Sequence, residues 1–361
     1  MIRSHHESTV HSGRTTRRRI GTAALLVALS PLLLALKYAE PGPRLEVDPS
    51  IPSWHPAPLT IVPEEEFNLV GADVMDEITL GWAKLFRQAY PRLSVTMEAR
   101  SSGSGGPALT EGRAHAAPVG RELLPAEEKA FIDKFGYRPL AIRVATGSVG
   151  SLGKTASSVI LVHKDNPIAG LTFAQLDAIY STTRRRGYKE VKTWGDLGLK
   201  GEWANLPIHL YGLKHPNGIE WYFSQFVMLG GEYKNNIQFV KGQGFTHAFT
   251  VAANDMAKNK GGLTYALLAN VTPDVRVVPI AENEGDPFVA PTQKSVADHT
   301  YPLSRYVYIF VNRPPGKPLE PKTKEFLKLV LSREGQQVVA DEGVYIPLNA
   351  DVVREELAKL E

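Results

Sequence analysis

Short apolar runs alternate with amphipathic stretches from about residue 65 to the C-terminus, which is the pattern of an α/β fold. Residues 67–71 predict a strand that ends at a glycine, and residues 93–98 predict a second strand because apolar and polar side chains alternate there. Between them, residues 78–90 predict a helix. Its apolar side chains recur every three or four positions: Ile78, Trp82, Leu85, Phe86 and Ala89.

The same rhythm continues through the rest of the chain. Apolar runs at 159–162 and 306–311 predict buried strands, and residues 171–180 predict a helix with Thr172 as its N-cap. Residues 322–341 predict one long helix with an inward apolar face. No internal repeat or low-complexity tract interrupts the pattern.

The N-terminus has the features of an export signal. An arginine triplet at 17–19 precedes an apolar run over residues 20–36, and this order is typical of a signal peptide. The run is short for a membrane span, so we expect residues 1–39 to be a signal peptide or an uncleaved anchor. Either the general secretory route or the twin-arginine route would take the protein to the periplasm or another extracytoplasmic space. Residues 40–63 contain seven prolines and are expected to form a linker or a wrapped arm.

Composition narrows the possible functions. Residues 1–39 hold six of the 41 Lys and Arg residues and one of the 38 acidic residues, which leaves 35 basic and 37 acidic groups in the rest of the chain. A near-neutral body argues against nucleic-acid binding, which needs a basic face. The sequence has no cysteine, and this excludes disulfides, thiolate metal sites, a cysteine nucleophile and a lipidated cysteine anchor.

A series of short motifs carries a family resemblance. Residues 301–312 read Tyr-Pro-Leu-Ser-Arg-Tyr-Val-Tyr-Ile-Phe-Val-Asn, and Ser-Arg-Glu-Gly-Gln at 332–336 and Gly-Val-Tyr-Ile-Pro at 343–347 follow. Earlier pieces are Val-Gly-Ala-Asp-Val-Met from residue 70, Gly-Arg-Glu-Leu from residue 120 and Trp-Gly-Asp-Leu from residue 194. In this order, the pieces resemble the phosphate-type solute-binding proteins of ABC importers.

The resemblance implies the type II periplasmic-binding fold, in which two α/β lobes are joined by two crossover strands and enclose a ligand cleft. One lobe would comprise residues 64–158 and 306–361, and the other residues 159–305, with 40–63 as the Pro-rich linker. The implied function is that of an exported, non-enzymatic solute-binding protein. It would capture phosphate or a related small anion for the permease of an ABC importer or for a membrane sensor, as a monomer without a cofactor.

The resemblance also places the ligand at strand-to-helix turns. Helix N-termini supply free N–H groups and the positive end of the helix dipole, which suit an anion. The Gly- and Ser-rich segment 100–107 is expected to be a loop that opens a helix, with Pro107 near the first turn. The expected ligand-binding residues are Asp73, Ser102, Ser104, Gly105, Arg121, Asn217 and Gly218. Asp73 could instead cap a helix, and Arg121 could instead form a structural or interlobe ion pair.

Several positions depart from the motifs of the family. Five residues stand where it usually has a hydroxyl group or a cation: Ala72, Val74, Gly120, Leu213 and Ile219. Each lost bond to an ionised ligand would forfeit roughly 1.5–3 kcal/mol. The departures predict weak phosphate binding, or a ligand whose apolar part faces the apolar replacements. They also leave open a degenerate binding-fold protein that acts as a structural or partner-binding module without phosphate binding.

Three further signals have simpler interpretations. Residues 148–155 nearly match a phosphate-binding P-loop, but the segment precedes a strand instead of following one, so we expect a surface hairpin or a loop near the hinge. The arginines at 184–186 are expected to form a solvated face, with contact to an anionic membrane or transporter as the alternative. An enzyme on this fold would have only Asp73, Arg121 and His215 as candidate acid–base groups.

Overall fold

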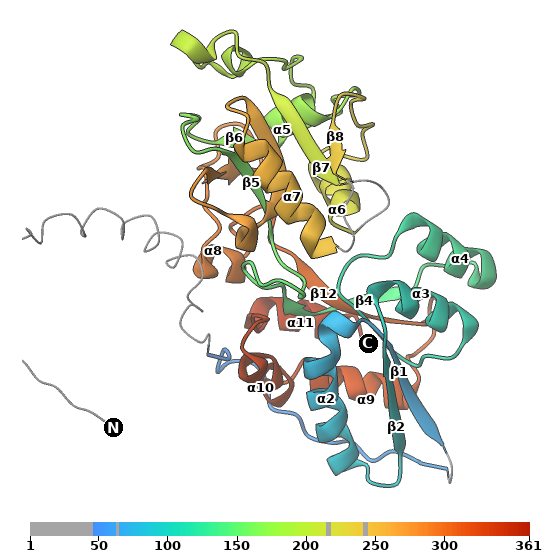
Figure 1. The fold of residues 1–361 in the computed structure, drawn as a ribbon. Helices are drawn as coiled ribbons and strands as arrows, with labels where there is room; N and C mark the ends of the chain where they lie inside the picture. The colour runs from blue at the N-terminus through green and yellow to red at the C-terminus, as the bar shows by residue number, and fades with distance from the viewer. Residues whose placement is uncertain (1–45, 63–64, 214–217, 241–244) are drawn as a thin grey trace, which may run out of the picture.

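The computed structural model describes residues 46–62, 65–213, 218–240 and 245–361. They form two α/β bodies, one above the other in Figure 1. We call the lower body, which contains β1 and α2, lobe I, and the upper body, which contains β5 and α7, lobe II. The predicted signal peptide or anchor at 1–39 lies outside the described residues.

Lobe I is built around two pieces of β-sheet. Strand β1 (Glu66–Gly71) is parallel to β2 (Ser94–Ala99), and a parallel bridge between Leu69 and Ala116 links β1 to the start of β3 (Ala117–Val119). In the second piece, β12 (Tyr306–Val311) lies between β3 and β4 (Leu140–Thr146) and is antiparallel to both. The helical elements of lobe I are η1 (Asp73–Met75), α2 (Asp76–Ala89), α3 (Ser102–Glu111), α4 (Pro125–Phe135), α9 (Pro321–Val330), α10 (Arg333–Glu342) and α11 (Ala350–Ala358).

The core of lobe I confirms the helix predicted over residues 78–90. The apolar face of α2 buries Trp82 and Phe86 completely. The Phe86 ring lies 5.6 Å from the Phe67 ring of β1 and 5.3 Å from the Phe326 ring of α9. Aromatic rings at these separations add to the free energy gained by burying their apolar surface.

Lobe II contains a mixed five-stranded sheet in the order β10-β5-β9-β7-β8. Its strands are β5 (Ser158–His163), β7 (His209–Leu213), β8 (Gln238–Val240), β9 (Gly262–Leu267) and β10 (Val275–Val278), and a small parallel pair is formed by β6 (Leu171–Thr172) and β11 (Ile280–Ala281). Its helices are α5 (Phe173–Tyr180), α6 (Gly218–Phe226), α7 (Phe245–Ala257) and α8 (Gln293–Ala297), with the short turns η2 (Trp194–Leu197), η3 (Gly201–Trp203) and η4 (Leu268–Asn270). Thr172 is the N-cap of α5, as predicted, and accepts the N–H of Gln175.

The chain passes between the lobes twice, through residues 147–157 and 298–305. The two passages lie side by side, because the N–H of Gly147 donates to the carbonyl of Arg305 over 2.7 Å. Thr146 and Tyr306 then face each other in the β4–β12 ladder. The hydrophobic cores of the two lobes are separate clusters, as expected for a two-lobed fold. The boundaries at 158/159 and 305/306 stay a prediction.

Two helix predictions are wrong in their boundaries. Residues 322–341 form two helices, because the chain turns at Leu331 and the Ser332 side chain then caps α10 by accepting the N–H of Gly335. The expected loop at 100–107 is largely helical, since α3 already begins at Ser102. Gly105 and Gly106 are buried there, and only small residues let α3 pack this closely against β3 and α4.

Residues 46–62 lie along lobe I as an arm. Ile51 is fully buried in the core of lobe I. The Trp54 indole N–H donates to Glu325 over 2.8 Å, and the Trp54 backbone N–H donates to Glu334 over 2.7 Å. In the described part of the chain, no helix is both long enough and apolar enough to cross a membrane.

Candidate ligand-binding site

Three turns of lobe I that contain predicted site residues meet at one edge of its sheet. The first follows β1 and contains Asp73, the second follows β2 and begins α3, and the third follows β3 and contains Arg121. Their strands run in the same direction, so their carboxyl ends share an edge. In open α/β sheets, ligands bind outside such an edge.

The start of α3 offers donors for an anion. Ser101 is the N-cap residue, but its side chain makes no capping hydrogen bond. The helix itself has no acceptor for the N–H groups of Ser102 and Gly103, because they belong to its first turn. Ser104 already uses its N–H, which donates to the carbonyl of Ser101 over 3.0 Å. A first turn without a side-chain cap is a site where an external anion can accept hydrogen bonds.

The hydroxyl groups expected to bind the ligand are partly used within the protein. Ser104 Oγ lies 2.9 Å from the carbonyl oxygen of Gly71 and 2.7 Å from that of Ser101, so it can donate to either. Ser102 Oγ accepts the N–H of Gly120 over 3.3 Å. Gly105 is on the buried side of α3, where a Cβ would lie 2.7 Å from Val119 Cγ2. Packing therefore explains Gly105 without a ligand, and its ligand contact stays a prediction.

Arg121 forms an ion pair within lobe I. Its two terminal nitrogens each lie 2.7 Å from a carboxylate oxygen of Glu127, and both side chains are largely buried. Glu127 also accepts the N–H of Leu124 at the start of α4. The pair borders the start of α3, since a Cβ on Gly103 would lie 3.8 Å from Glu127 Oε1 and 3.9 Å from Arg121 Nη2. An anion at this site would have to compete with Glu127 for Arg121.

Gly218 brings the second lobe to the same place. It is the first residue of α6, and a Cβ there would lie 2.6 Å from Cδ of Arg121. The N-terminus of α6, in lobe II, thus lies against Arg121 of lobe I, the residue predicted to contribute a positive charge to the site. Asn217 and His215 lie outside the described residues. Asp73 is exposed, and its carboxylate accepts the N–H of Val74 over 3.0 Å.

A second ion pair, next in sequence to Arg121, connects lobe I to the second passage between the lobes. Glu122 accepts a hydrogen bond from Arg305 over 3.1 Å and another from the Tyr308 hydroxyl over 3.2 Å. Arg305 is almost fully buried, and its guanidinium lies 4.6 Å from the Tyr222 ring of α6. The Tyr222 hydroxyl in turn donates to the carbonyl of Ser304 over 2.9 Å. These contacts fix α6 against the second passage between the lobes.

The apolar replacements do not line this site as a group. Ala72 belongs to the core of lobe I, and Leu213 and Ile219 belong to the core of lobe II. The expectation that Ala72 and Ile219 face an apolar part of the ligand is therefore not supported, because their side chains point into packed interiors. Val74 does lie at the site, where it approaches Gly120.

Thr155 is a site neighbour that the sequence did not single out. A Cβ on Gly120 would lie 2.6 Å from Thr155 Oγ1, 2.7 Å from Val74 Cγ2 and 3.2 Å from Ser102 Oγ. The space that a serine side chain would occupy at position 120 is thus filled by Thr155 and Val74. The only signal for Thr155 was its place at the end of the near P-loop segment 148–155, which gave no indication of its partner.

The arginines at 184–186 are not simply a solvated face. Arg186 donates to the carbonyls of Val227 over 2.6 Å and Phe226 over 2.5 Å, and Arg185 donates to that of Leu229 over 2.7 Å. These carbonyls belong to the last turn of α6 and the chain just after it. Cations stabilise a helix C-terminus because they complement its dipole, which explains the arginines as part of lobe II.

Comparison with known proteins identifies the family. A sequence profile described as the PBP superfamily domain matches residues 61–334. The phosphate-binding protein PstS of Pseudomonas aeruginosa is 37% identical over 315 residues, which cover 87% of this chain and 92% of that protein.

The chain belongs to the PBP superfamily. The resemblance deduced from the motifs is thereby confirmed, together with the type II fold.

Two solved structures share this fold. The ABC-type phosphate transport receptor from Vibrio cholerae has a TM-score of 0.50 at 20% identity and covers 78% of this chain and 99% of its own. PstS from Borrelia burgdorferi has a TM-score of 0.52 at 13% identity and covers 79% of this chain and 100% of its own. At these identities, the likeness concerns the fold alone.

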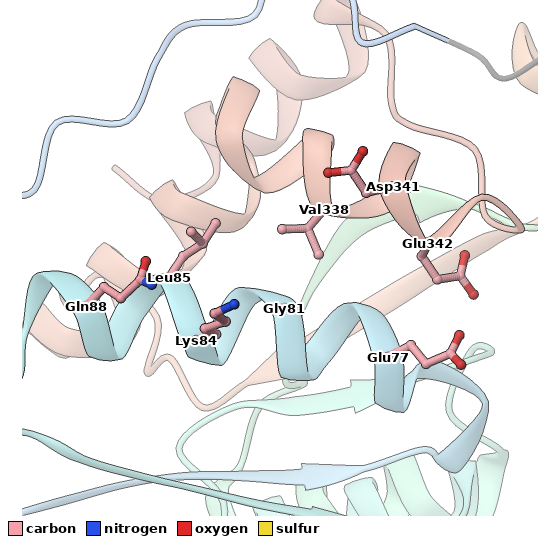
Figure 2. Close-up of a pocket in the computed structure, with 8 residues that line it drawn as sticks. All are labelled: Glu77, Gly81, Lys84, Leu85, Gln88, Val338, Asp341 and Glu342. Carbon is pink, nitrogen blue, oxygen red and sulfur yellow. The ribbon is translucent and has the colours of Figure 1, made fainter.

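None of the predicted site residues lines the surface pocket shown in Figure 2. It has a volume of about 530 Å³ and lies between α2 and α10 (Figure 2). The carboxylates of Glu77, Asp341 and Glu342 line it, with Lys84 as its cation. Lys154 does not line the pocket but lies 3.0 Å from carboxylate oxygens of Glu77 and Glu342. Three carboxylates with two ammonium groups still leave an excess of negative charge, which is unfavourable for an anion.

Proposed function

We propose that this chain is an exported solute-binding protein that captures phosphate or a related small anion for an ABC importer. The relatives support the transport role, since the protein from Pseudomonas aeruginosa that is 37% identical is a phosphate-binding protein. The chain would act without catalysis, as a receptor outside the cytoplasm. The proposal also includes export by the general secretory or the twin-arginine route, a monomeric state and an anchoring role of residues 1–39. The receptor would deliver its anion to a membrane sensor if not to an importer.

One structural observation carries the proposal. The N-terminus of α3 in lobe I and the N-terminus of α6 in lobe II meet at Arg121, where Gly218 contacts its side chain. Two helix N-termini and a guanidinium group form a donor set for a small oxyanion. Binding between the lobes would then stabilise the closed arrangement, as in other hinged binding proteins. Ser102, Ser104, Gly105, Arg121, Asn217, Gly218 and Asp73 remain the proposed ligand-binding set.

A second candidate function is a structural or partner-binding module without phosphate binding. It is favoured by the Arg121–Glu127 pair, which neutralises the cation, and by the filled space beside Gly120. Both features predict that phosphate binds more weakly here than at a site with a free arginine and a free serine.

Calorimetric titration distinguishes the two candidates. The protein expressed from the full sequence would be titrated with phosphate, sulfate, molybdate and small organic phosphates at fixed ionic strength. Saturable binding of at least one oxyanion at submillimolar concentration is expected for the receptor. No heat and no thermal stabilisation with any of them at millimolar concentration would favour the module instead.

A further inference from the structure

The first passage between the lobes contains a closed loop. Ser148 donates its N–H to the carbonyl of Thr155 over 2.8 Å, and its own carbonyl accepts the N–H of Ser157 over 3.0 Å. These bonds form a neck that holds the two ends of residues 148–155 together. We call residues 148–155 the strap.

The C-terminal end of the strap is attached to lobe I at the candidate site. Thr155 Oγ1 donates to the carbonyl of Gly120 over 2.6 Å, and the Thr155 N–H donates to the Tyr345 hydroxyl over 3.2 Å. That hydroxyl donates to the carbonyl of Val74 over 2.8 Å. Burial raises the pKa of Tyr345 to about 12, so the hydroxyl keeps the proton it donates. Thr155 thus reaches two of the three site turns of lobe I.

Lys154 strengthens the same attachment. Its ammonium group lies 3.0 Å from carboxylate oxygens of both Glu77 in α2 and Glu342 in α10. Glu342 and Lys154 are largely buried, so this pair is less screened by solvent than the surface ion pairs of the protein.

The N-terminal half of the strap is attached to lobe II. Val149 packs against the hydrophobic core of that lobe. Gly150 lies so close to η4 that a Cβ there would be 2.5 Å from the Cβ of Leu268 and 3.3 Å from the backbone nitrogen of Ala269. A strap fixed to both lobes must bend or detach at one end when the lobes move apart.

We propose that the strap couples the spacing of the lobes to the geometry of the candidate anion site, with Thr155 as its positioning residue. When the lobes separate, the strap pulls on the turns that contain Gly120 and Val74. Conversely, when these turns adopt the arrangement that binds an anion, the strap favours the closed position of the lobes. The coupling to anion binding rests on the proposed function, whereas the effect on lobe spacing does not.

The spacing of the lobes can be measured with one label on each. Because the sequence has no cysteine, Lys129→Cys in lobe I and Lys258→Cys in lobe II give a unique pair of sites for spin labels. Both lysine side chains are mostly exposed. Distances between the labels would be recorded by pulsed electron resonance without added anion.

Two variants disturb opposite ends of the strap. Thr155→Val removes the hydroxyl but keeps the shape, and Gly150→Ala pushes the strap off η4. Both are expected to shift the label distances to longer and broader distributions, whereas Thr155→Ser restores the parent distribution. Thr182→Val is the matched control, since its hydroxyl only meets the carbonyl of Glu232 over 3.3 Å on the surface of lobe II. Unchanged distances in Thr155→Val and Gly150→Ala would overturn the proposal.

Phosphate titration of the same proteins tests the coupling. Thr155→Val is expected to weaken phosphate binding roughly three- to tenfold, the effect of about one hydrogen bond, and Thr155→Ser to restore it. Longer distances with unchanged affinity would overturn the coupling. If the parent binds neither phosphate nor any of the other oxyanions named above, the proposed function fails, and the label distances still decide whether the strap holds the lobes.

Discussion

The start of α3 differs from the starts of the other helices that begin with a hydroxyl or amide side chain. In α5, α10 and α11, the side chains of Thr172, Ser332 and Asn349 each accept an N–H from the first turn. At α3, Ser101 caps nothing. In a capped first turn, a side chain of the protein accepts the N–H groups, whereas in an uncapped first turn these donors remain for a ligand. The difference separates helix starts that stabilise the fold from one that can bind an anion.

The largest effect should follow from giving α3 a cap of its own. In Ser101→Asp, the carboxylate would accept the N–H groups of the first turn and place a negative charge at the proposed anion site. Phosphate affinity is expected to fall about a hundredfold or more, while stability without anion rises by about 0.5–1 kcal/mol. Calorimetry and thermal unfolding would measure the two effects. Phosphate affinity equal to that of the parent would show that α3 does not bind the anion.

The second prediction concerns the first turn of α6, which contains the buried Glu220. Burial raises the pKa of Glu220 to about 7, although a hydrogen bond with Tyr233 acts in the other direction. Below about pH 4.5 the carboxyl group is protonated in both the folded and the unfolded protein. Between about pH 4.5 and pH 7 it loses its proton only in the unfolded chain. The free energy of unfolding should therefore fall by about 3 kcal/mol as the pH rises through this window.

Denaturant titrations at several pH values, with Glu220→Gln as the comparison, would measure this contribution. The variant should have a flatter pH profile in the same window. Matching profiles would show that Glu220 ionises normally in the folded protein.

The third prediction separates Arg121 from its internal partner. Glu127→Gln removes the competing charge beside α3, so phosphate affinity is expected to increase about tenfold as the guanidinium group becomes available. Glu128→Gln is the control, because Glu128 is the next residue and only forms a looser surface pair with Arg138. An increase in both variants would point to a general change in charge instead.

The smallest effect is expected at the start of α10, where Ser332 serves as a cap. Ser332→Ala should lower the free energy of unfolding by about 1 kcal/mol, since Ser332 caps α10, and leave phosphate affinity unchanged. Ser101→Ala should change neither quantity much, because its side chain caps nothing and the donors proposed for the anion at this turn are backbone N–H groups. Equal loss of stability in the two variants would remove the distinction between the helix starts.

Much of the fold could be predicted from the sequence because it depends on local periodicity. The strand at 306–311 and the helix around Trp82 and Phe86 follow from the spacing of their apolar residues. The division of residues 322–341 could not be predicted from that spacing. Both helices continue one apolar face, and the break depends on the Ser332 cap and on the packing of Gly335 against the carbonyls of Leu329 and Val330.

The candidate site shows the same limit. The sequence by itself determined the family motifs, the absence of cysteine chemistry and the turns that contain Ser102, Arg121 and Gly218. Only the tertiary structure decided that Arg121 pairs with Glu127 and that Ala72 and Ile219 point into cores. It alone brought Thr155 to Gly120 and Tyr345, which are 35 and 190 residues away in sequence. Periodicity tells which side of its own element a residue occupies, but the partner it meets there depends on how distant elements pack.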